Sequence, residues 1–219
     1  MRRLIAWAVL AGTGALAGCA SAPAPDSARA TPQLRLAPAL LGRPLNLQQH
    51  LTLQAPGREQ QLDVLLEADA RHVQMGLLAM GQVAARLDWD GTTLDESRAA
   101  WWPQAVSGSR ILSDLQLTLW PVAAIQAALP AGWSLVEDGN VRTLSQGGEV
   151  VTVITRLCPP TADSTAARGT ANPSSCAPSQ DPSAASTLIE LDQRREHFKL
   201  TIESREAGDA PATPPLNPP

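Results

Sequence analysis

The sequence predicts a mainly β protein in which one strongly curved antiparallel sheet is closed by two short helices. Three observations favour this fold class. Apolar and polar residues alternate with a period of two over residues 45–94 and again after residue 133, which is typical of strands with one buried face. Glycine-containing turn signals separate these segments. A helical segment at about 109–130 interrupts them and is more apolar than a surface crossover needs to be. Two packed sheets with the helices at one end are the alternative.

The chain begins with the features of a bacterial lipoprotein signal peptide, which we expect to span residues 1–18. Two arginines precede an apolar run over residues 4–16, and Ala-Gly-Cys19 follows. The run is shorter than the about 20 residues that a helix needs to cross a bilayer. Small residues before a cysteine suit cleavage and attachment of lipid to the thiol. We therefore expect Cys19 to be lipidated; an ordinary secretory signal with a chance cysteine is the alternative.

The residues after Cys19 bear on the location. In enterobacterial lipoproteins an aspartate at this place retains the protein in the inner membrane. This chain has Ala20 and Ser21. By resemblance to those lipoproteins, we expect a lipid-anchored protein of the outer membrane that faces the periplasm.

Composition divides the remaining chain into three parts. Residues 19–43 are rich in alanine and proline, and we expect them to form a flexible tether. Residues 207–219 are proline-rich, and we expect a disordered tail. A single folded domain is then expected over residues 44–206.

The first half of the domain reads as an antiparallel meander. Alternation predicts strands near residues 45–53, 62–66, 73–77 and 83–89, with a return strand from residue 92. Pro56-Gly57 and Gly81 mark turns between them. Asp90-Gly91 is a strong hairpin signal, because a type I′ turn needs positive φ angles.

The helical insertion is expected as two short helices. Ser107 or Ser109 is the candidate N-cap of the first. Trp120-Pro121 opens the second, where a proline at the first helical position is harmless. Apolar residues recur at helical spacing through both segments: Ile111, Leu112, Leu115, Leu119, Val122, Ile125, Ala128 and Leu129.

Strands resume after the insertion, near residues 133–136, 141–144, 150–157, 187–191 and 198–202, which makes nine or ten in all. Cys158 and Cys176 flank a loop between two of them. In an oxidising periplasm such a pair favours a disulfide, which would contribute about 3 kcal/mol. The alternative is a redox pair or metal site, but the cysteines are not in a C-x-x-C arrangement and have no histidine nearby.

Composition argues against several functions. The chain has 17 basic and 21 acidic residues, so it has no electrostatic footprint for nucleic acid. Its three histidines are far apart, and we expect no metal and no cofactor. The carboxylates of residues 88, 90, 95 and 96 cluster at one hairpin. A solvated turn explains this cluster more simply than a calcium or acid–base site does. No nucleophile motif is present, and we expect no enzyme.

The segment from Arg110 to Pro121, together with Asp90-Gly91 and Gly132-Trp133, resembles a family of outer-membrane lipoproteins with a domain of unknown function. The resemblance covers about residues 45–203. Members often accompany genes for aryl-polyene and fatty-acid-like biosynthesis. The family is similar in architecture to the lipoprotein-localisation factors LolA and LolB, which implies a half-open β-barrel, a helical lid and an apolar cavity for acyl chains. The family has no known catalytic residues to carry over.

Candidate site residues are of two kinds. Six apolar residues are candidates for lining a ligand cavity, with ordinary core packing as the alternative: Met75, Leu77, Trp89, Leu115, Trp120 and Ile125. Trp101 and Trp102 are candidates for contact with a membrane or a partner, with packing at the end of the meander as the alternative.

Two functional hypotheses follow. The first is a carrier that binds or transfers a hydrophobic lipid-like ligand in the periplasm, such as an aryl-polyene lipid or the acyl chains of a lipoprotein. The second is a non-catalytic scaffolding lipoprotein that binds a protein of an envelope biosynthesis or export system.

Overall fold

A single antiparallel sheet dominates the protein, as predicted. The computed structural model describes residues 30–104, 106–157 and 186–207. The chain divides into two compact units, Met1–Thr31 and Pro32–Pro219, and only the second is considered below. Its described strands are β1 (Leu45–Ala55), β2 (Arg58–Ala68), β3 (Val73–Ala79), β4 (Gln82–Trp89), β5 (Leu94–Arg98), β6 (Trp133–Asp138), β7 (Val141–Gln146), β8 (Glu149–Leu157), β9 (Thr187–Gln193) and β10 (Phe198–Glu206).

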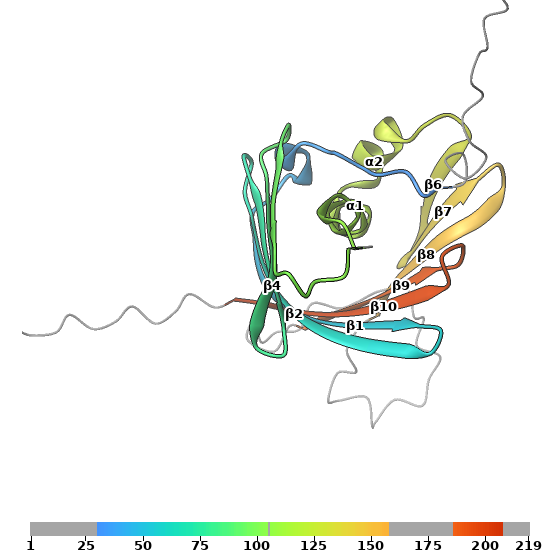
Figure 1. Cartoon of the computed structure of the whole chain (residues 1–219). Coiled ribbons are helices and arrows are strands. Elements are labelled where there is room, and N and C mark those ends of the chain that lie inside the picture. Colours follow the sequence, from blue (N-terminus) through green and yellow to red (C-terminus); the bar gives the residue numbers. More distant parts are fainter. Residues whose placement is uncertain (1–29, 105, 158–185, 208–219) are drawn as a thin grey trace, which may run out of the picture. The chain divides into compact units, whose positions relative to one another are not determined.

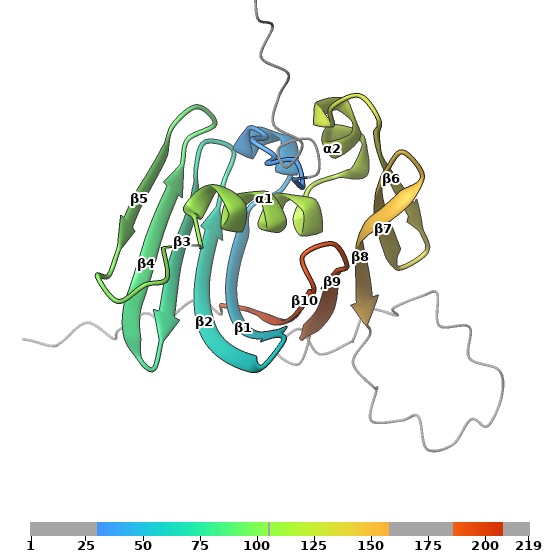
Figure 2. The same cartoon turned by 45° about the vertical axis from the view of Figure 1, so that its right-hand side comes forward.

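The sheet is open and curved into a trough. Its order is β5-β4-β3-β2-β1-β10-β9-β8-β7-β6, so that the first and last strands pair in the middle. This arrangement confirms the curved sheet and rules out the two-sheet alternative. We call the half of the sheet that ends at β5 and the half that ends at β6 its two wings. Helix α1 (Gly108–Leu119) crosses the trough between these wings, and α2 (Val122–Ala128) follows it beside β6 (Figures 1 and 2). Both helices lie in the range predicted for the insertion.

Helix α2 partly covers the edge strand β6. The side-chain Nε2 of Gln126 donates to the carbonyl oxygen of Leu135 at 2.7 Å. Edge strands carry unpaired backbone groups that invite other chains to pair, and this contact occupies one of them. In the described part of the chain, no helix is long and apolar enough to cross a membrane.

The N-terminal end of α1 is capped by two side chains. Ser107 is the N-cap, and its hydroxyl oxygen accepts from the backbone N–H of Arg110 at 3.3 Å. Glu96 of β5 accepts from the N–H of Gly108 at 3.0 Å, and a carboxylate is favourable at this positive end of the helix dipole. The approach is close: a Cβ on Gly108 would lie 2.6 Å from a methyl carbon of Leu87.

The C-terminal end of α1 is held by two arginines from the opposite wing. The Nη1 of Arg142 donates to the carbonyl oxygens of Leu117, Thr118 and Trp120 at 2.8–3.2 Å. Arg156 adds a bond to the Thr118 carbonyl at 3.0 Å. These cations satisfy carbonyls that the helix itself leaves unpaired and match its negative end. Helix α1 is therefore a strut with complementary charge at both ends.

Glu137 completes this arginine cluster. Its carboxylate accepts from Arg142 and, at 3.0 Å, from Arg156. Burial lowers the pKa of the Arg142 guanidinium, and Glu137 opposes that shift. Burial would raise the pKa of Glu137, but the bonds from the two arginines outweigh it and lower that pKa below its ordinary value.

Residues 32–41 form a strap that packs on α1. Leu34, Leu36 and Leu41 are buried. The backbone of Leu36 bonds in both directions with the side chain of Gln116, each bond 2.9 Å long. The indole N–H of Trp89 also donates to the Leu36 carbonyl, at 2.8 Å. The strap ends in a short 3-10 helix, Pro38–Leu41.

This strap corrects one prediction. The flexible tether expected over residues 19–43 was wrong for residues 32–41, which belong to the folded unit. Proline content alone suggested an unpacked segment, whereas the alternate leucines at 34 and 36 have a partner surface on α1 that only the folded structure creates. Residues 19–29 lie outside the described residues.

One turn also differs from its prediction. The loop between β4 and β5 spans residues 90–93, so it is not a two-residue type I′ turn. The carboxylate of Asp90 accepts from the backbone N–H groups of Thr92 and Thr93, each at 2.7 Å. Gly91 has a φ of 94°, which explains why glycine suits this position.

Candidate functional site

The six predicted cavity residues come together in the trough. All are buried and belong to one apolar cluster between the sheet and the helices: Met75, Leu77, Trp89, Leu115, Trp120 and Ile125. Trp120 and Ile125 have no exposed surface, and Trp89 has 1%. Met75, Leu77 and Trp89 come from the concave face of the sheet and the other three from the helical segment, so together they form the closed part of the trough.

The concave face continues beyond this closed part toward the hairpin ends. We define its apolar floor as Leu51 and Leu53 of β1, Leu62 of β2, and Phe198 and Leu200 of β10. Leu51 lies opposite both Leu62 and Ile202, and Leu53 opposite Leu200. Alternation places these side chains on the same face as the core residues of their strands. Each floor residue is only partly buried, so the trough keeps apolar surface in contact with solvent.

A buried polar pair separates the floor from the strand ends farther along. Nε2 of Gln49 donates to the hydroxyl of Ser204 at 2.9 Å, across β1 and β10. Both side chains are buried. Among the described residues no buried side-chain nitrogen or oxygen lacks a hydrogen-bond partner. The polar groups around the floor are thus satisfied, and what the floor itself offers a ligand is apolar contact.

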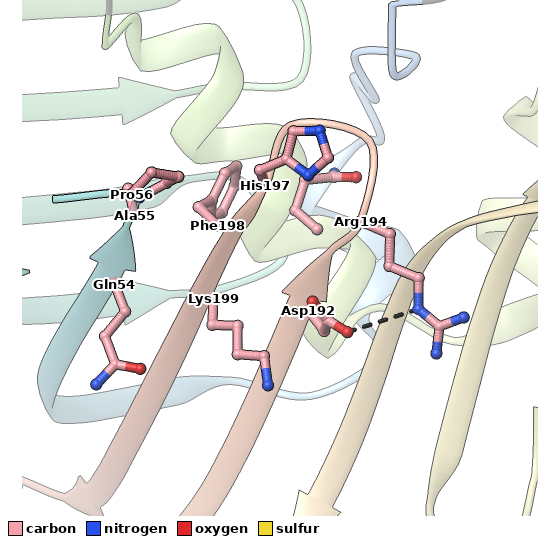
Figure 3. A pocket seen from close by; sticks show the side chains of 9 residues that line it. Gln54, Ala55, Pro56, Asp192, Arg194, His197, Phe198 and Lys199 are labelled. Carbon is pink, nitrogen blue, oxygen red and sulfur yellow. Dashed lines mark ion pairs between the residues drawn. The ribbon is translucent and has the colours of Figure 1, made fainter. Parts of the chain in front are cut away.

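A hollow of about 480 Å³ lies at the tips of two neighbouring hairpins (Figure 3). Phe198 of the floor forms part of its wall. The β1–β2 and β9–β10 hairpins supply the lining together: Gln54, Ala55, Pro56, Asp192, Gln193, Arg194, His197, Phe198 and Lys199. Arg194 pairs with Asp192 at 3.5 Å. Lys199, the only lysine of the chain, adds a further positive charge from the convex face, since it alternates with Phe198 and Leu200 along β10.

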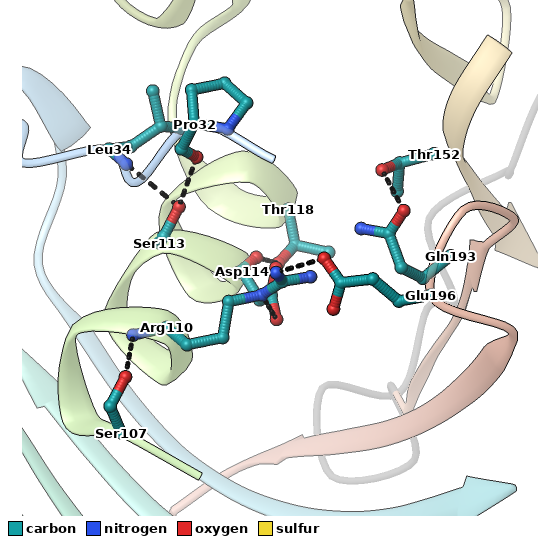
Figure 4. Close-up of polar contacts among 10 residues, drawn as sticks. All are labelled: Pro32, Leu34, Ser107, Arg110, Ser113, Asp114, Thr118, Thr152, Gln193 and Glu196. Atoms are coloured by element: carbon teal, nitrogen blue, oxygen red, sulfur yellow. Dashed lines mark hydrogen bonds and ion pairs between the residues drawn. The ribbon is translucent and has the colours of Figure 1, made fainter. Parts of the chain in front are cut away.

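A polar bridge joins α1 to the β9–β10 turn beside the floor (Figure 4). Nε of Arg110 donates to Asp114 on the same helix at 2.8 Å. Its Nη1 donates to Glu196 of the turn at 2.5 Å. The guanidinium carbon lies 5.8 Å from the centre of the Phe198 ring, within the range of a cation–π contact. Arg110 is therefore the charged group placed directly at the apolar floor.

Gln193 completes the bridge from β9. In the orientation that satisfies both ends of its amide, its oxygen accepts from Nη2 of Arg110 at 3.0 Å. Its nitrogen then donates to the carbonyl of Val151 at 2.8 Å and to the hydroxyl of Thr152. The guanidinium thus has an acceptor at each nitrogen: one from α1, one from β9 and one from the β9–β10 turn.

Charge in the bridge is balanced by its neighbours. Burial raises the pKa of the Asp114 carboxyl, and the Arg110 guanidinium opposes that shift only in part. Burial disfavours the charge of Arg110, but Asp114 and Glu196 outweigh it and raise its pKa above the ordinary value. Arg110 is positively charged, as a guanidinium is over the ordinary pH range.

The two tryptophans proposed as contact residues have different environments. Trp101 is 47% exposed, in the loop after β5. Trp102 is buried, and its indole N–H donates to the Val106 carbonyl at 3.1 Å. The prediction of an exposed contact was wrong for Trp102, because the turn after β5 directs this ring into the core. The two rings meet edge to face at 6.5 Å.

The histidines occupy separate places. His50 lies 2.8 Å from Asp63, and His72 lies 2.9 Å from Asp88. The bond to Asp88 raises the pKa of His72, and the same bond lowers the pKa of Asp88. Within the described ranges, no group of three or more His, Cys, Asp or Glu side chains could hold a metal ion. Cys19, Cys158 and Cys176, to which lipidation and a disulfide were assigned, lie outside the described residues.

Sequence reasoning missed the floor and the bridge. Alternation in β1 does show that Leu51 and Leu53 share a face with Leu45. It cannot show which of them the helices leave uncovered. The salt bridge between Arg110 and Glu196 joins residues 86 positions apart, and no local pattern indicates it.

The fold and site define a class of protein: an open antiparallel sheet that wraps a helical strut and keeps apolar surface on its inner face. The comparison with protein families agrees on the extent of this unit. Residues 46–206 match the family described as "Protein of unknown function (DUF3261)", and the chain belongs to this family. A comparison with curated proteins finds no match for the chain.

Proposed function

We propose that this protein binds the apolar chain of a lipid-like ligand on the floor of its trough, as a carrier in the periplasm. The observation that carries the proposal is the partly exposed apolar floor on an otherwise core-forming face. Leaving apolar side chains in contact with water is unfavourable, and covering them with a ligand recovers about 0.8 kcal/mol per buried methylene. An alkyl chain that lies along Leu200, Leu53 and Leu51 would gain this contact without any change in the polar network.

The fold supports binding in a second way. The strut α1 and the strap prevent collapse of the two wings onto the floor, because both ends of α1 are bonded to the sheet. A surface held open in this manner is preorganised, so a ligand need not bear the cost of ordering it.

Calorimetry with 1-decanol tests this proposal, using Leu53→Gln and a matched Leu65→Gln control. Leu53 faces the floor, whereas Leu65 lies on the convex face and is 53% exposed. We expect decanol to bind the unaltered chain, to bind the Leu53→Gln variant at least about tenfold more weakly, and to bind the Leu65→Gln variant unchanged. Circular dichroism checks that both variants are folded. Absence of binding to the unaltered chain, or equal weakening in both variants, would contradict the proposal.

We also propose that the carrier is an outer-membrane lipoprotein, anchored through Cys19. The signal-peptide features of residues 1–18 support this. Growth of cells with an alkyne-bearing fatty acid is expected to label the full chain and not a Cys19→Ala variant. Label on both proteins, or on neither, would argue against a lipid anchor at this cysteine.

A scaffolding function is the second candidate, and one observation favours it. The β3–β4 turn and the loop after β5 lie at the same end of the sheet, because Ala99 pairs with Ala84. Apolar side chains are exposed there: Met80 at 91%, Val83 at 44% and Trp101 at 47%. A protein partner could cover them. A Met80→Ser, Trp101→Ser variant with unchanged decanol binding but lost envelope function would favour this reading.

A further inference from the structure

We propose that Arg110 binds the carboxylate head of an amphiphilic ligand, and that Glu196 occupies this place while no ligand is bound. The inference rests on the proposed function and adds the class of ligand to it: a fatty acid or similar amphiphile with an anionic carboxylate and an unbranched chain.

Arg110 lies at one end of the floor. Its guanidinium carbon lies 5.8 Å from the ring centre of Phe198, and Phe198 is the floor residue nearest the β9–β10 turn. Leu200 follows on the same face of β10, with Leu53 opposite it. A carboxylate bonded to Arg110 therefore places the attached chain at the start of the floor.

The two carboxylates on Arg110 differ in a way that marks one of them as exchangeable. Asp114 comes from the same helix, one turn away, and its side chain is 17% exposed. Glu196 reaches in from the β9–β10 turn, and its side chain is 38% exposed. The neighbouring residue of that turn, His197, has a left-handed backbone with φ 57°, which is uncommon for a non-glycine residue. Asp114 is thus a fixed partner of Arg110, whereas Glu196 belongs to an exposed turn.

Exchange of Glu196 for a ligand carboxylate conserves the chemistry of the site. The incoming group accepts the same N–H of Arg110 and brings the same charge, while Glu196 turns to solvent. Guanidinium groups suit this role because they bond carboxylates in a fixed, directional geometry. Loss of one ion pair is balanced by formation of another, and burial of the chain on the floor then favours the ligand.

The hollow at the hairpin ends touches the surroundings of Arg110 at two residues. Phe198 and Gln193, both in contact with Arg110, line it. Lys199 and Asp192, which pair across β10 and β9, alternate with Phe198 and Gln193 and therefore lie on the convex face of the sheet (Figure 3). Arg110 is therefore the cation that a ligand head meets at the floor, and it attracts a carboxylate more strongly than a neutral or positive head.

The test compares three amphiphiles of equal chain length by calorimetry at pH 7.5: decanoate, 1-decanol and decylamine. With the full chain carrying Cys19→Ala, so that no attached lipid competes, we expect decanoate to bind at least tenfold more tightly than decanol. Arg110→Gln is expected to remove this difference and to leave decanol binding within about twofold. Glu196→Gln is expected to raise decanoate affinity at least threefold, because the competing carboxylate is gone. A merely structural salt bridge would lose affinity in both variants.

Control variants lie on the outward face of the same hairpin. Glu190 and Arg205 are exposed residues of β9 and β10, and Glu190→Gln and Arg205→Gln should leave the decanoate preference unchanged. Tighter binding of decylamine than of decanoate, or a decanoate preference that survives Arg110→Gln, would overturn the headgroup assignment while leaving the chain-binding function intact. Failure of both decanoate and decanol to bind would overturn the proposed function and this inference together.

Discussion

Replacement of Arg142 by methionine is expected to destabilise the fold by about 3–5 kcal/mol, the usual cost of removing one partner from a buried charged cluster. The side chain is 6% exposed and donates to three carbonyls at the end of α1. Methionine fills much of the same volume but donates nothing, so these carbonyls lose their partner in a buried place. Glu137 also loses the nearer of its two arginines.

Thermal unfolding followed by circular dichroism checks this expectation. For a domain of this size the loss corresponds to a fall in melting temperature of roughly 10 °C. Arg156→Met, at a position 28% exposed, should cost clearly less, and Arg194→Met, at a position 54% exposed, should change little. A similar melting temperature for all three variants would show that the bonds from Arg142 do not hold α1 in place.

Removal of the strap is expected to have an effect of similar or greater size. A chain that begins at residue 44 lacks Leu34, Leu36 and Leu41, whose burial contributes about 1.5–3 kcal/mol each. It also lacks the backbone groups that bond Gln116 and Trp89. These losses are comparable with the whole stability of a typical domain, about 5–15 kcal/mol. We expect this shortened chain not to fold cooperatively.

The matched control is a chain that begins at residue 30, which retains the strap. Both chains can be compared by the chemical-shift dispersion of their amide protons. Dispersed spectra for the longer chain and collapsed spectra for the shorter one are the expected result. Equal dispersion in both spectra would mean that the domain folds without the strap, which would contradict this prediction.

Much of the fold is predictable because local rules and global packing agree in it. Alternation in β1 through β4 matches the buried face that the sheet presents, and Ser107 caps α1 as its residue type suggests. The strap was missed for the opposite reason. Its prolines match the composition of a linker, and only contact with Gln116 and Trp89 distinguishes Leu34 and Leu36 from linker residues.

The candidate site was less predictable than the fold. The six apolar residues singled out from the sequence are all buried in the core, since size and hydrophobicity favour the interior. The floor depends on a quantity that sequence does not carry: the position at which α1 crosses the sheet. Arg110 and Glu196 come together for the same reason, because the strut places one above the turn that holds the other.

The central claim is that an apolar chain lies on the floor formed by Leu51, Leu53, Leu62, Phe198 and Leu200. Nuclear Overhauser contacts between 1-decanol and the methyl groups of the isotope-labelled protein measure this directly. The account predicts contacts from the decanol methylenes to Leu53, Leu200 and Leu51. Contacts confined to Met80, Val83 and other exposed outer residues would contradict it.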